Sequence, residues 1–401
     1  MTTALARSMT DAFSPELRDR LVGLRRAIHR EPELAFAEHR TAEKLEQALR
    51  AVGVGDIRRV AGTGLVGRIH GQRTDAPTVA IRGDIDALPI AEATGLPFAS
   101  GTSGVMHACG HDVHATWTVA AAALLLERPA VGDVLVVLQP AEETGQGAEA
   151  VLASGALDGV GAIFGGHVDR RFAVGQVVAD EGPLAASADT FEIELIGEGA
   201  HAARPHEAAD PIVAAAAVIS ALQTIVSRRL DPATPGVVSI GTVRAGSAPN
   251  VIPDRAILGG TIRAVDDRSR QLMLDELRRI ATSVASAHRV AAKVSVDRGT
   301  PPIINPPETT RWARDAAARV VGEQNVVPLG FLNLAGEDFA SYMQRIHGCF
   351  LRIGAREPDG EIIPAHAPRF YAAEESIFVG AAVLAECARV ASSALQGRRG
   401  V

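Results

Sequence analysis

The order of the strand and helix patterns constrains the fold most, because that order changes in the middle of the chain. Up to about residue 182, short apolar runs at 78–81, 134–138 and 162–164 alternate with helical stretches. Such alternation predicts an α/β domain with a largely parallel sheet. Beyond this point the patterns follow the order β-α-β-β-α-β, which is the order of a ferredoxin-like unit.

The ferredoxin-like pattern lies between two α/β stretches, so we interpret it as an inserted domain. The proline-rich segment at 301–307 marks the return of the α/β pattern. We therefore predict a catalytic domain formed by residues 1–185 and 300–401, with an inserted α+β domain at 186–299. Hydrophobic residues make up 47% of the chain, which is enough to supply a core for each domain.

The charge and cysteine content exclude several classes of protein. A net charge of −7 without a long basic run provides no binding surface for nucleic acid. Only three cysteines occur, which argues against a disulfide framework and favours a reducing compartment. The N-terminal residues lack the apolar core of a signal peptide, and no stretch approaches the ~20 apolar residues of a membrane span. We therefore predict a cytoplasmic protein with no nucleic-acid or membrane partner.

The densest group of coordinating side chains is the segment MHACGHDVH at 106–114, which directly precedes a predicted helix at about 115–127. Imidazole and thiolate groups are the usual protein ligands of zinc and related metals. A single histidine here could simply cap the helix. Three histidines, a cysteine and an aspartate together indicate a metal site.

Three other polar segments directly follow predicted strands. They are RGDID at 82–86, QPAEE at 139–143 and GGHV at 165–168. Because ligands bind at the carboxyl ends of the strands in open α/β sheets, we expect these segments to meet near the MHACGHDVH segment. Paired glutamates can divide metal binding from proton transfer, and Asp84 or Asp86 can orient a ligand histidine. The sequence therefore predicts a metal-dependent hydrolase.

Further motifs occur in order from about residue 24 to residue 370 and carry a resemblance to a known family. The whole set reads RGDIDALP, MHACGHDVH, QPAEE, GGHV, GEGAHAARPH, GSAPNVIPD, GTIR, GEDF and AHAP. The chain resembles the aminoacylase and carboxypeptidase-G-like family of two-metal peptidases, in the branch of hippurate hydrolase, N-acyl-amino-acid amidohydrolases and auxin-conjugate hydrolases. This resemblance implies a zinc-peptidase-like domain, with a mostly parallel mixed sheet flanked by helices, and an inserted ferredoxin-like lid or dimerisation domain.

The resemblance also implies the metal ligands. Cys109 matches a thiolate that bridges two metal ions, and Glu143 matches a carboxylate ligand. His111, His167 and His366 match terminal imidazole ligands. The implied cofactor is a pair of divalent ions per subunit, with zinc, manganese or cobalt compatible with the mixed ligand set.

Five further residues receive roles from the same resemblance. Glu142 matches the general base, and Asp84 matches a carboxylate placed behind the metal ligands. His201 matches a histidine that reaches the active site of a partner subunit and donates to the oxyanion. Asn250 and Arg263 match residues that hold the substrate carboxylate. The implied reaction is cleavage of the amide bond of an N-acyl amino acid, by a homodimer or tetramer assembled through the inserted domain.

Some local differences from the family pattern leave the substrate open. A glycine stands at position 83 where alanine is usual, Asp169-Arg170 replace a proline-containing turn, and the last ligand segment reads AHAPRF. A dipeptidase, a carboxypeptidase or another C–N hydrolase remains possible on the same scaffold. Outside this class, the alternatives are a cysteine hydrolase that uses Cys109 as nucleophile and a non-catalytic metal-binding scaffold. A zinc nucleobase deaminase is disfavoured because the P-C-x-x-C motif is missing.

Overall fold

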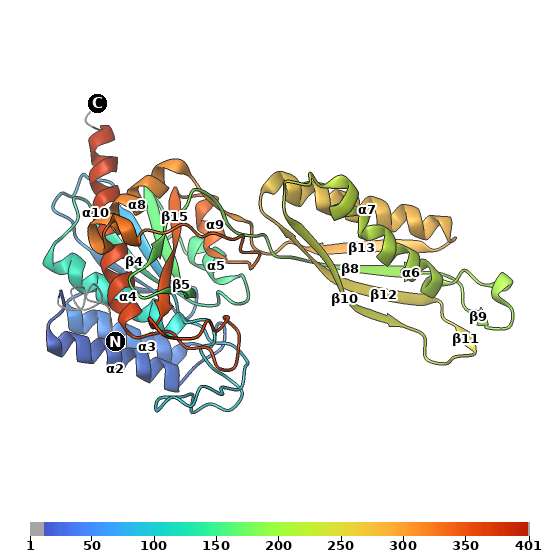
Figure 1. The fold of residues 1–401 in the computed structure, drawn as a ribbon, viewed down its shortest axis with the longest axis horizontal. Helices are drawn as coiled ribbons and strands as arrows, with labels where there is room; N and C mark the ends of the chain where they lie inside the picture. Colours follow the sequence, from blue (N-terminus) through green and yellow to red (C-terminus); the bar gives the residue numbers. More distant parts are fainter. Residues whose placement is uncertain (1–11, 400–401) are drawn as a thin grey trace. The chain divides into compact units, whose positions relative to one another are not determined.

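The computed structural model describes residues 12–399, which form two compact units (Figure 1). The first unit contains residues 12–182, 305–331 and 338–399. The second contains residues 183–304 and also the short segment 332–337, which the sequence prediction placed with residues 300–401. Each unit is described below by itself.

The first unit is built on a seven-stranded mixed sheet with the order β1-β2-β4-β3-β5-β15-β6. Its central strands run parallel, since β3 pairs in parallel with β4 and β5, and β15 pairs in parallel with β5. The three apolar runs predicted as strands lie in β3, β4 and β5, so this part of the prediction is confirmed. The strands are β1 (Asp56–Val60), β2 (Gly64–Ile69), β3 (Val79–Asp84), β4 (Val134–Gln139), β5 (Ala162–Ala173), β6 (Val177–Val178) and β15 (Gly348–Arg356).

Helices flank this sheet, and the alternation of side chains along β15 shows how they are layered. Cys349 and Leu351 belong to the same buried cluster as residues of α4, α8 and α10. Phe350 points the other way and packs on Phe339 of α9, with 4.9 Å between the ring centroids. The helices are α2 (Pro15–Arg30), α3 (His39–Val52), α4 (His111–Glu127), α5 (Gly147–Ala153), α8 (Pro307–Val321), α9 (Phe339–Met343) and α10 (Glu375–Arg399). A 3-10 turn, η3 (Glu323–Asn325), follows α8.

Local sequence explains where several helices begin and end. Ser14 accepts a hydrogen bond from the Leu17 amide at 3.3 Å and caps α2, whose first residue is Pro15. Gly53 ends α3 with a left-handed φ of 109°. Helix α4 begins at His111, earlier than the predicted position near 115, so the metal-site histidine lies in its first turn. The preceding Gly110 has φ 89°, and a β-carbon there would lie 2.4 Å from Val168 Cγ2, so only glycine fits.

The second unit has the predicted ferredoxin-like topology. Its sheet order is β10-β12-β8-β13, and all neighbouring strands are antiparallel. Helices α6 and α7 pack on each other and on this sheet (Figure 1). The elements are β7 (Gly182–Ala185), β8 (Asp189–Ile196), β9 (Ala200–His201), η1 (Pro205–Glu207), α6 (Pro211–Leu222), the π-helical turn η2 (Ile225–Arg229), β10 (Gly236–Ala245), β11 (Val251–Ile252), β12 (Arg255–Ala264), α7 (Asp267–Ala287), β13 (Ala291–Asp297) and β14 (Ile303–Asn305).

Two helical stretches among the described residues are long and apolar enough to cross a membrane, so the expectation that no stretch approaches this length was too strict. They are Pro211–Arg229 and Glu375–Arg398, both with a mean hydropathy of 1.5. Alanine together with Ile, Val and Leu gives both stretches their apolar composition. For Glu375–Arg398, 72% of the apolar window is buried inside the protein, as in an ordinary core helix, whereas the value for Pro211–Arg229 is 33%. Length and composition alone are weak evidence for a membrane span, since core helices pass the same test.

Candidate metal centre

Three buried side chains from two parts of the first unit meet at the start of α4. The ligand atoms of Cys109, His111 and His167 all lie within 4.8 Å of one another. Cys109 Sγ lies 3.1 Å from His167 Nε2. His167 was predicted in a turn after a short strand, but it lies inside β5, because β15 continues to pair with β5 as far as Asp169 and beyond. The polar GGHV segment thus remains part of the sheet.

A second group shares the same cysteine. Cys109, Glu143 and His366 also have ligand atoms within 4.8 Å of one another, and Glu143 Oε1 lies 3.4 Å from His366 Nε2. The His366 backbone amide donates to Ala108 O at 2.8 Å, which ties the distant AHAP segment to the residue before Cys109. His366 has a left-handed φ of 66° and a side chain that is 53% exposed, so this group opens towards solvent. Two adjoining groups that share one thiol are the arrangement expected of two bridged metal ions.

Glu142 lies beside both groups, and its carboxylate is within 4.8 Å of the ligand atoms of His111 and Glu143. Its Oε2 is 3.9 Å from His111 Nε2, and its Oε1 accepts a hydrogen bond from the Asp338 amide at 3.2 Å. The side chains of Glu142 and Glu143 are only 10% and 12% exposed. A carboxylate held at the edge of a metal cluster with little solvent around it is placed to exchange a proton with a water molecule there.

Two aspartates at the end of β3 contact the Nδ1 atoms of His111 and His114 and so orient these two rings. Asp86 Oδ1 lies 3.1 Å from His111 Nδ1, which leaves Nε2 of the same ring directed at the cluster. Asp84 Oδ1 lies 2.6 Å from His114 Nδ1 and 3.8 Å from His111 Nδ1. Asp86 therefore makes the closer contact with the candidate ligand, while Asp84 orients His114.

The donor atoms fit divalent metal ions. His111 Nε2 and Glu143 Oε1 are buried and make no hydrogen bond to any residue between 12 and 399. Buried polar atoms without a partner are rare and indicate a group that binds there, such as an ion. Burial, together with the neighbouring His114 ring and the Arg352 guanidinium, holds the pKa of His167 well below its usual value, so this imidazole is neutral and keeps a lone pair for coordination. The mixture of sulfur, nitrogen and oxygen donors suits zinc, manganese or cobalt.

The protonation of Cys109 argues against a cysteine hydrolase. Burial, together with the nearby carboxylate of Glu143, raises the pKa of the Cys109 thiol to about 12. A nucleophilic cysteine needs the opposite shift, towards a lower pKa. A divalent cation binds this side chain as the thiolate and so displaces its proton. The site therefore favours coordination by Cys109 over nucleophilic attack.

Asp338 and Arg82 are functional candidates that the sequence analysis missed. Asp338 belongs to the GEDF motif, to which the sequence analysis assigned no role; it precedes α9 and makes no capping hydrogen bond with its side chain. Its buried carboxylate accepts from Gln139 Nε2 at 2.9 Å, from the Ala148 amide at 2.9 Å and from Arg82 Nη2 at 2.8 Å. These three hydrogen bonds hold Asp338 in place and so fix its backbone amide, which donates to Glu142. The sequence offered one signal for this pair of residues, which is that Arg82 places a charge directly after the apolar run at 78–81.

The residues predicted to contact the substrate lie in the second unit. His201 is exposed on β9, where its Nδ1 accepts from the Ala203 amide at 3.0 Å. Asn250 is exposed just before β11, and its carbonyl accepts from the Ala202 amide at 3.1 Å, so these two residues belong to one local structure. Arg263 is half-buried on β12 and donates to Ile262 O at 3.1 Å. Their roles at the reaction remain predictions.

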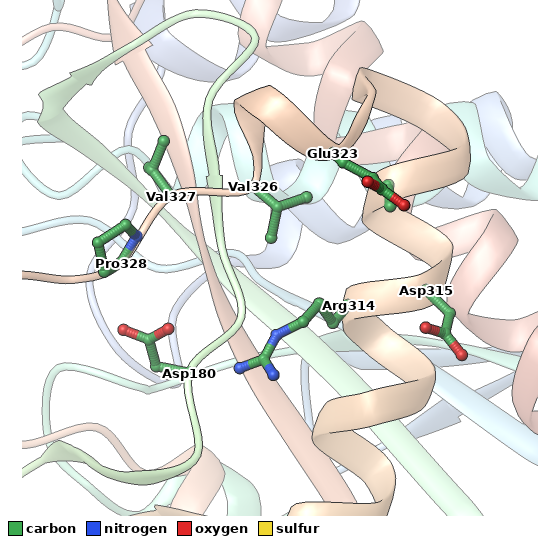
Figure 2. Close-up of a pocket in the computed structure, with 8 residues that line it drawn as sticks. Asp180, Arg314, Asp315, Glu323, Val326, Val327 and Pro328 are labelled. Carbon is green, nitrogen blue, oxygen red and sulfur yellow. The ribbon is translucent and has the colours of Figure 1, made fainter.

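The first unit also contains a cavity of about 420 Å³ (Figure 2). It is lined by part of α8, with Arg314 and Asp315, by Asp180, and by the segment 326–328. Arg314 is held there by a hydrogen bond to Ala179 O at 2.9 Å. None of the predicted site residues lines it, so it is not the predicted reaction site.

Comparison with known proteins agrees with the geometry. The family model described as peptidase family M20/M25/M40 matches residues 80–390. An N-acetylcysteine deacetylase of Bacillus subtilis is 41% identical over 373 residues, covering 92% of this chain and 96% of the relative. The IAA-amino acid hydrolase ILR1-like 4 of Arabidopsis thaliana is 38% identical, covering 92% of this chain and 85% of that protein. The crystal structure of the Bacillus subtilis YXEP protein, a dinuclear metal binding peptidase from the M20 family, has a TM-score of 0.83 and 38% identity and covers 94% of this chain and 99% of its own.

Proposed function

The chain belongs to peptidase family M20/M25/M40 and is a hydrolase of amide or peptide bonds, and from this premise we propose that it cleaves N-acyl amino acids to a carboxylic acid and a free amino acid. The observation that carries the proposal is the pair of adjoining ligand groups that share Cys109. The names of two relatives point to N-acyl amino acids as substrates, one with an acetyl group and one with the larger IAA group. These two names differ both in the acyl group and in how they specify the amino acid.

The implied cofactor is two divalent metal ions per chain. Cys109 would be shared by both ions, with His111 and His167 on one side and Glu143 and His366 on the other. When bound, such ions supply Lewis-acid activation of water and of the amide carbonyl. The buried unpartnered atoms of His111 and Glu143 support this assignment.

Glu142 would act as the general base. Its carboxylate would take a proton from the attacking water and return it to the leaving nitrogen, which is otherwise a poor leaving group. The hydrogen bond from the Asp338 amide to Oε1 leaves Oε2 on the side of His111. This orientation supports proton transfer at the cluster.

His201, Asn250 and Arg263 would complete the site from the second unit. His201 would donate to the developing oxyanion, and Asn250 and Arg263 would hold the carboxylate of the amino acid, for which a guanidinium offers two parallel donors. If His201 serves the active site of a partner subunit, a homodimer assembled through this unit is part of the catalyst. The exposure of His201 and Asn250 is compatible with this role.

A hydrolysis screen on metal-reconstituted protein tests the proposal, with release of a primary amine as the readout. The substrates are N-acetyl, N-benzoyl and longer-chain acyl amino acids, and unacylated dipeptides are the comparison class. The proposal predicts turnover of N-acyl amino acids, and preferential cleavage of the dipeptides would assign a dipeptidase instead. Release from amides that lack the free carboxylate should be poor, because Arg263 would then have no partner.

A cytoplasmic location completes the proposal. Cys109, Cys349 and Cys387 are all buried and free in the described part of the chain, as expected in a reducing compartment. Fractionation of expressing cells, with the enzyme followed by amine release, tests this location.

A further inference from the structure

The loop that carries Glu142 and Glu143 contains a strained residue. Ala141, the residue directly before Glu142, has a left-handed φ of 55° and is fully buried. Residues other than glycine rarely adopt this conformation, and they keep it only where neighbouring groups enforce it. A change of φ at this position would rotate the following residues and move both glutamate side chains.

Hydrogen bonds to both sides of Ala141 enforce the conformation. Its carbonyl accepts from the Gly147 amide at 3.1 Å and from Thr144 Oγ1 at 3.1 Å, both within the loop. Its amide donates to Glu38 Oε1 at 2.9 Å, which is a contact across 103 residues of sequence. Glu38 is therefore the partner of the Ala141 amide from outside the loop.

The placement of Glu38 is unusual for an acid at the start of a helix. Glu38 occupies the N-cap position of α3 but makes no capping hydrogen bond with its side chain. The side chain is instead fully buried, and its second oxygen accepts from Thr63 Oγ1 at 2.5 Å. Burial raises the pKa of Glu38, and the two donors favour its ionised form. Because the Glu38 side chain does not cap α3 and instead accepts hydrogen bonds from Thr63 and Ala141, its contacts point to a role beyond α3.

We propose that Glu38 is a positioning residue for the reaction, which holds the left-handed backbone of Ala141 and thereby directs Glu142 and Glu143 at the cluster. The inference rests on the proposed function, because it assigns Glu38 an effect only through the base Glu142 and the ligand Glu143. The hydrogen bonds of Glu38 go to Thr63 and Ala141, so its effect passes through the backbone.

A double-mutant cycle between Glu38 and Ala141 tests the inference. In Glu38→Ala the Ala141 amide loses its acceptor, and kcat should fall by about 100-fold with little change in KM, since small displacements of reacting groups have effects of this size. In the Ala141→Gly background, where the left-handed conformation carries little strain, the same Glu38→Ala change should lower kcat much less. An equal loss of kcat in both backgrounds would overturn the proposal.

Hydrogen exchange of the metal-free protein gives a readout that does not depend on activity. The peptide that covers residues 142–147 should exchange faster in Glu38→Ala than in the wild type, and this increase should shrink when Ala141→Gly is added. Unchanged exchange in Glu38→Ala would contradict a positioning role. If Glu38→Ala does not fold, Glu38→Met keeps the volume while removing the acceptor and takes its place in the cycle.

Three further variants distinguish a failure of the inference about Glu38 from a loss of stability and from a failure of the proposed function. Glu38→Gln keeps an oxygen for the Ala141 amide and should restore most of the kcat lost in Glu38→Ala. Glu386→Ala removes another buried acid of the same unit, which pairs with Arg128, Arg319 and Arg389, so it should reduce stability without lowering kcat. Glu142→Gln with full activity would refute the proposed function itself, whereas an inactive Glu142→Gln together with a fully active Glu38→Ala would refute only the inference.

Discussion

The two units present their candidate catalytic residues in contrasting ways. In the first unit, Cys109, His111 and His167 are at most 9% exposed, and buried groups fix several of the neighbouring side chains. In the second unit, His201 and Asn250 are exposed and held mainly by local backbone contacts. A buried, preorganised cluster can bind metal without further ordering, whereas exposed side chains acquire a defined position only when substrate or another chain contacts them. The first unit should therefore supply the metal ligands and the general base, and the second unit should supply the oxyanion donor and the substrate contacts, whose effect should depend on assembly.

The largest effect should follow from changing the base of the first unit. Glu142→Gln should lower kcat by about 10²–10⁴-fold, because the amide cannot accept the proton of the attacking water. The metal content, measured by atomic emission, should remain that of the wild type. Glu149→Gln is the matched control, since this glutamate lies on the nearby α5 with a 51% exposed side chain. Normal turnover by Glu142→Gln would show that the first unit does not supply the general base through this residue.

The next largest effect should come from His201 in the second unit. His201→Ala should lower kcat by about 10²–10³-fold, the usual loss when one oxyanion donor is removed. If His201 serves a partner subunit, mixing His201→Ala with Glu142→Gln and allowing exchange of subunits should recover part of the activity. His206→Ala, at another exposed histidine of the same unit, is the control. Full activity of His201→Ala would confine catalysis to the first unit.

A smaller effect, on binding and not on chemistry, is expected at Arg263. Arg263→Met should raise KM by about 10–100-fold with a smaller change in kcat, since a hydrogen bond to a charged group contributes about 1.5–3 kcal/mol. Arg255→Met on the same strand, whose native partner is Glu194, serves as the control. If the two variants have the same KM, Arg263 does not contact the substrate carboxylate.

The smallest predicted effect concerns the stability of the first unit. Burial would raise the pKa of Asp112, but Arg25 at 2.7 Å and His29 at 2.8 Å outweigh it and hold this pKa well below its usual value. A lowered folded-state pKa stabilises the protein above the unfolded value of about 3.9, and this contribution is lost as the pH falls below it. Thermal unfolding of metal-free Asp112→Asn should therefore depend less on pH between about 5 and 2 than that of the wild type. Identical pH profiles for the two proteins would show that this buried ion pair does not anchor α4.

The same contrast explains how much the sequence could predict. The cluster at 106–114 and the glutamate pair are local patterns, so their residue types and spacing already indicate a metal site. His366 could be assigned only through the family resemblance, because nothing local distinguishes it from other surface histidines. Asp338 and Glu38 were missed because their partners, Arg82 and Ala141, lie far away in the sequence and become neighbours only through folding.

Fold prediction succeeded where the hydrophobic period was clear and failed at boundaries set by tertiary contacts. The β-α-β-β-α-β order of the second unit was readable because its strands alternate and its helices are long. The strand that carries His167 was predicted too short, because pairing with β15, and not local propensity, extends it. The inclusion of residues 332–337 in the second unit likewise has no local signal.

Metal stoichiometry, measured together with activity on one preparation, tests the central claim most directly. The protein would be stripped with a chelator, titrated with zinc, manganese or cobalt, and assayed for amine release at each step. The account predicts that stripping abolishes turnover and that activity returns as two ions bind per chain. A stripped protein that keeps its full activity would contradict it.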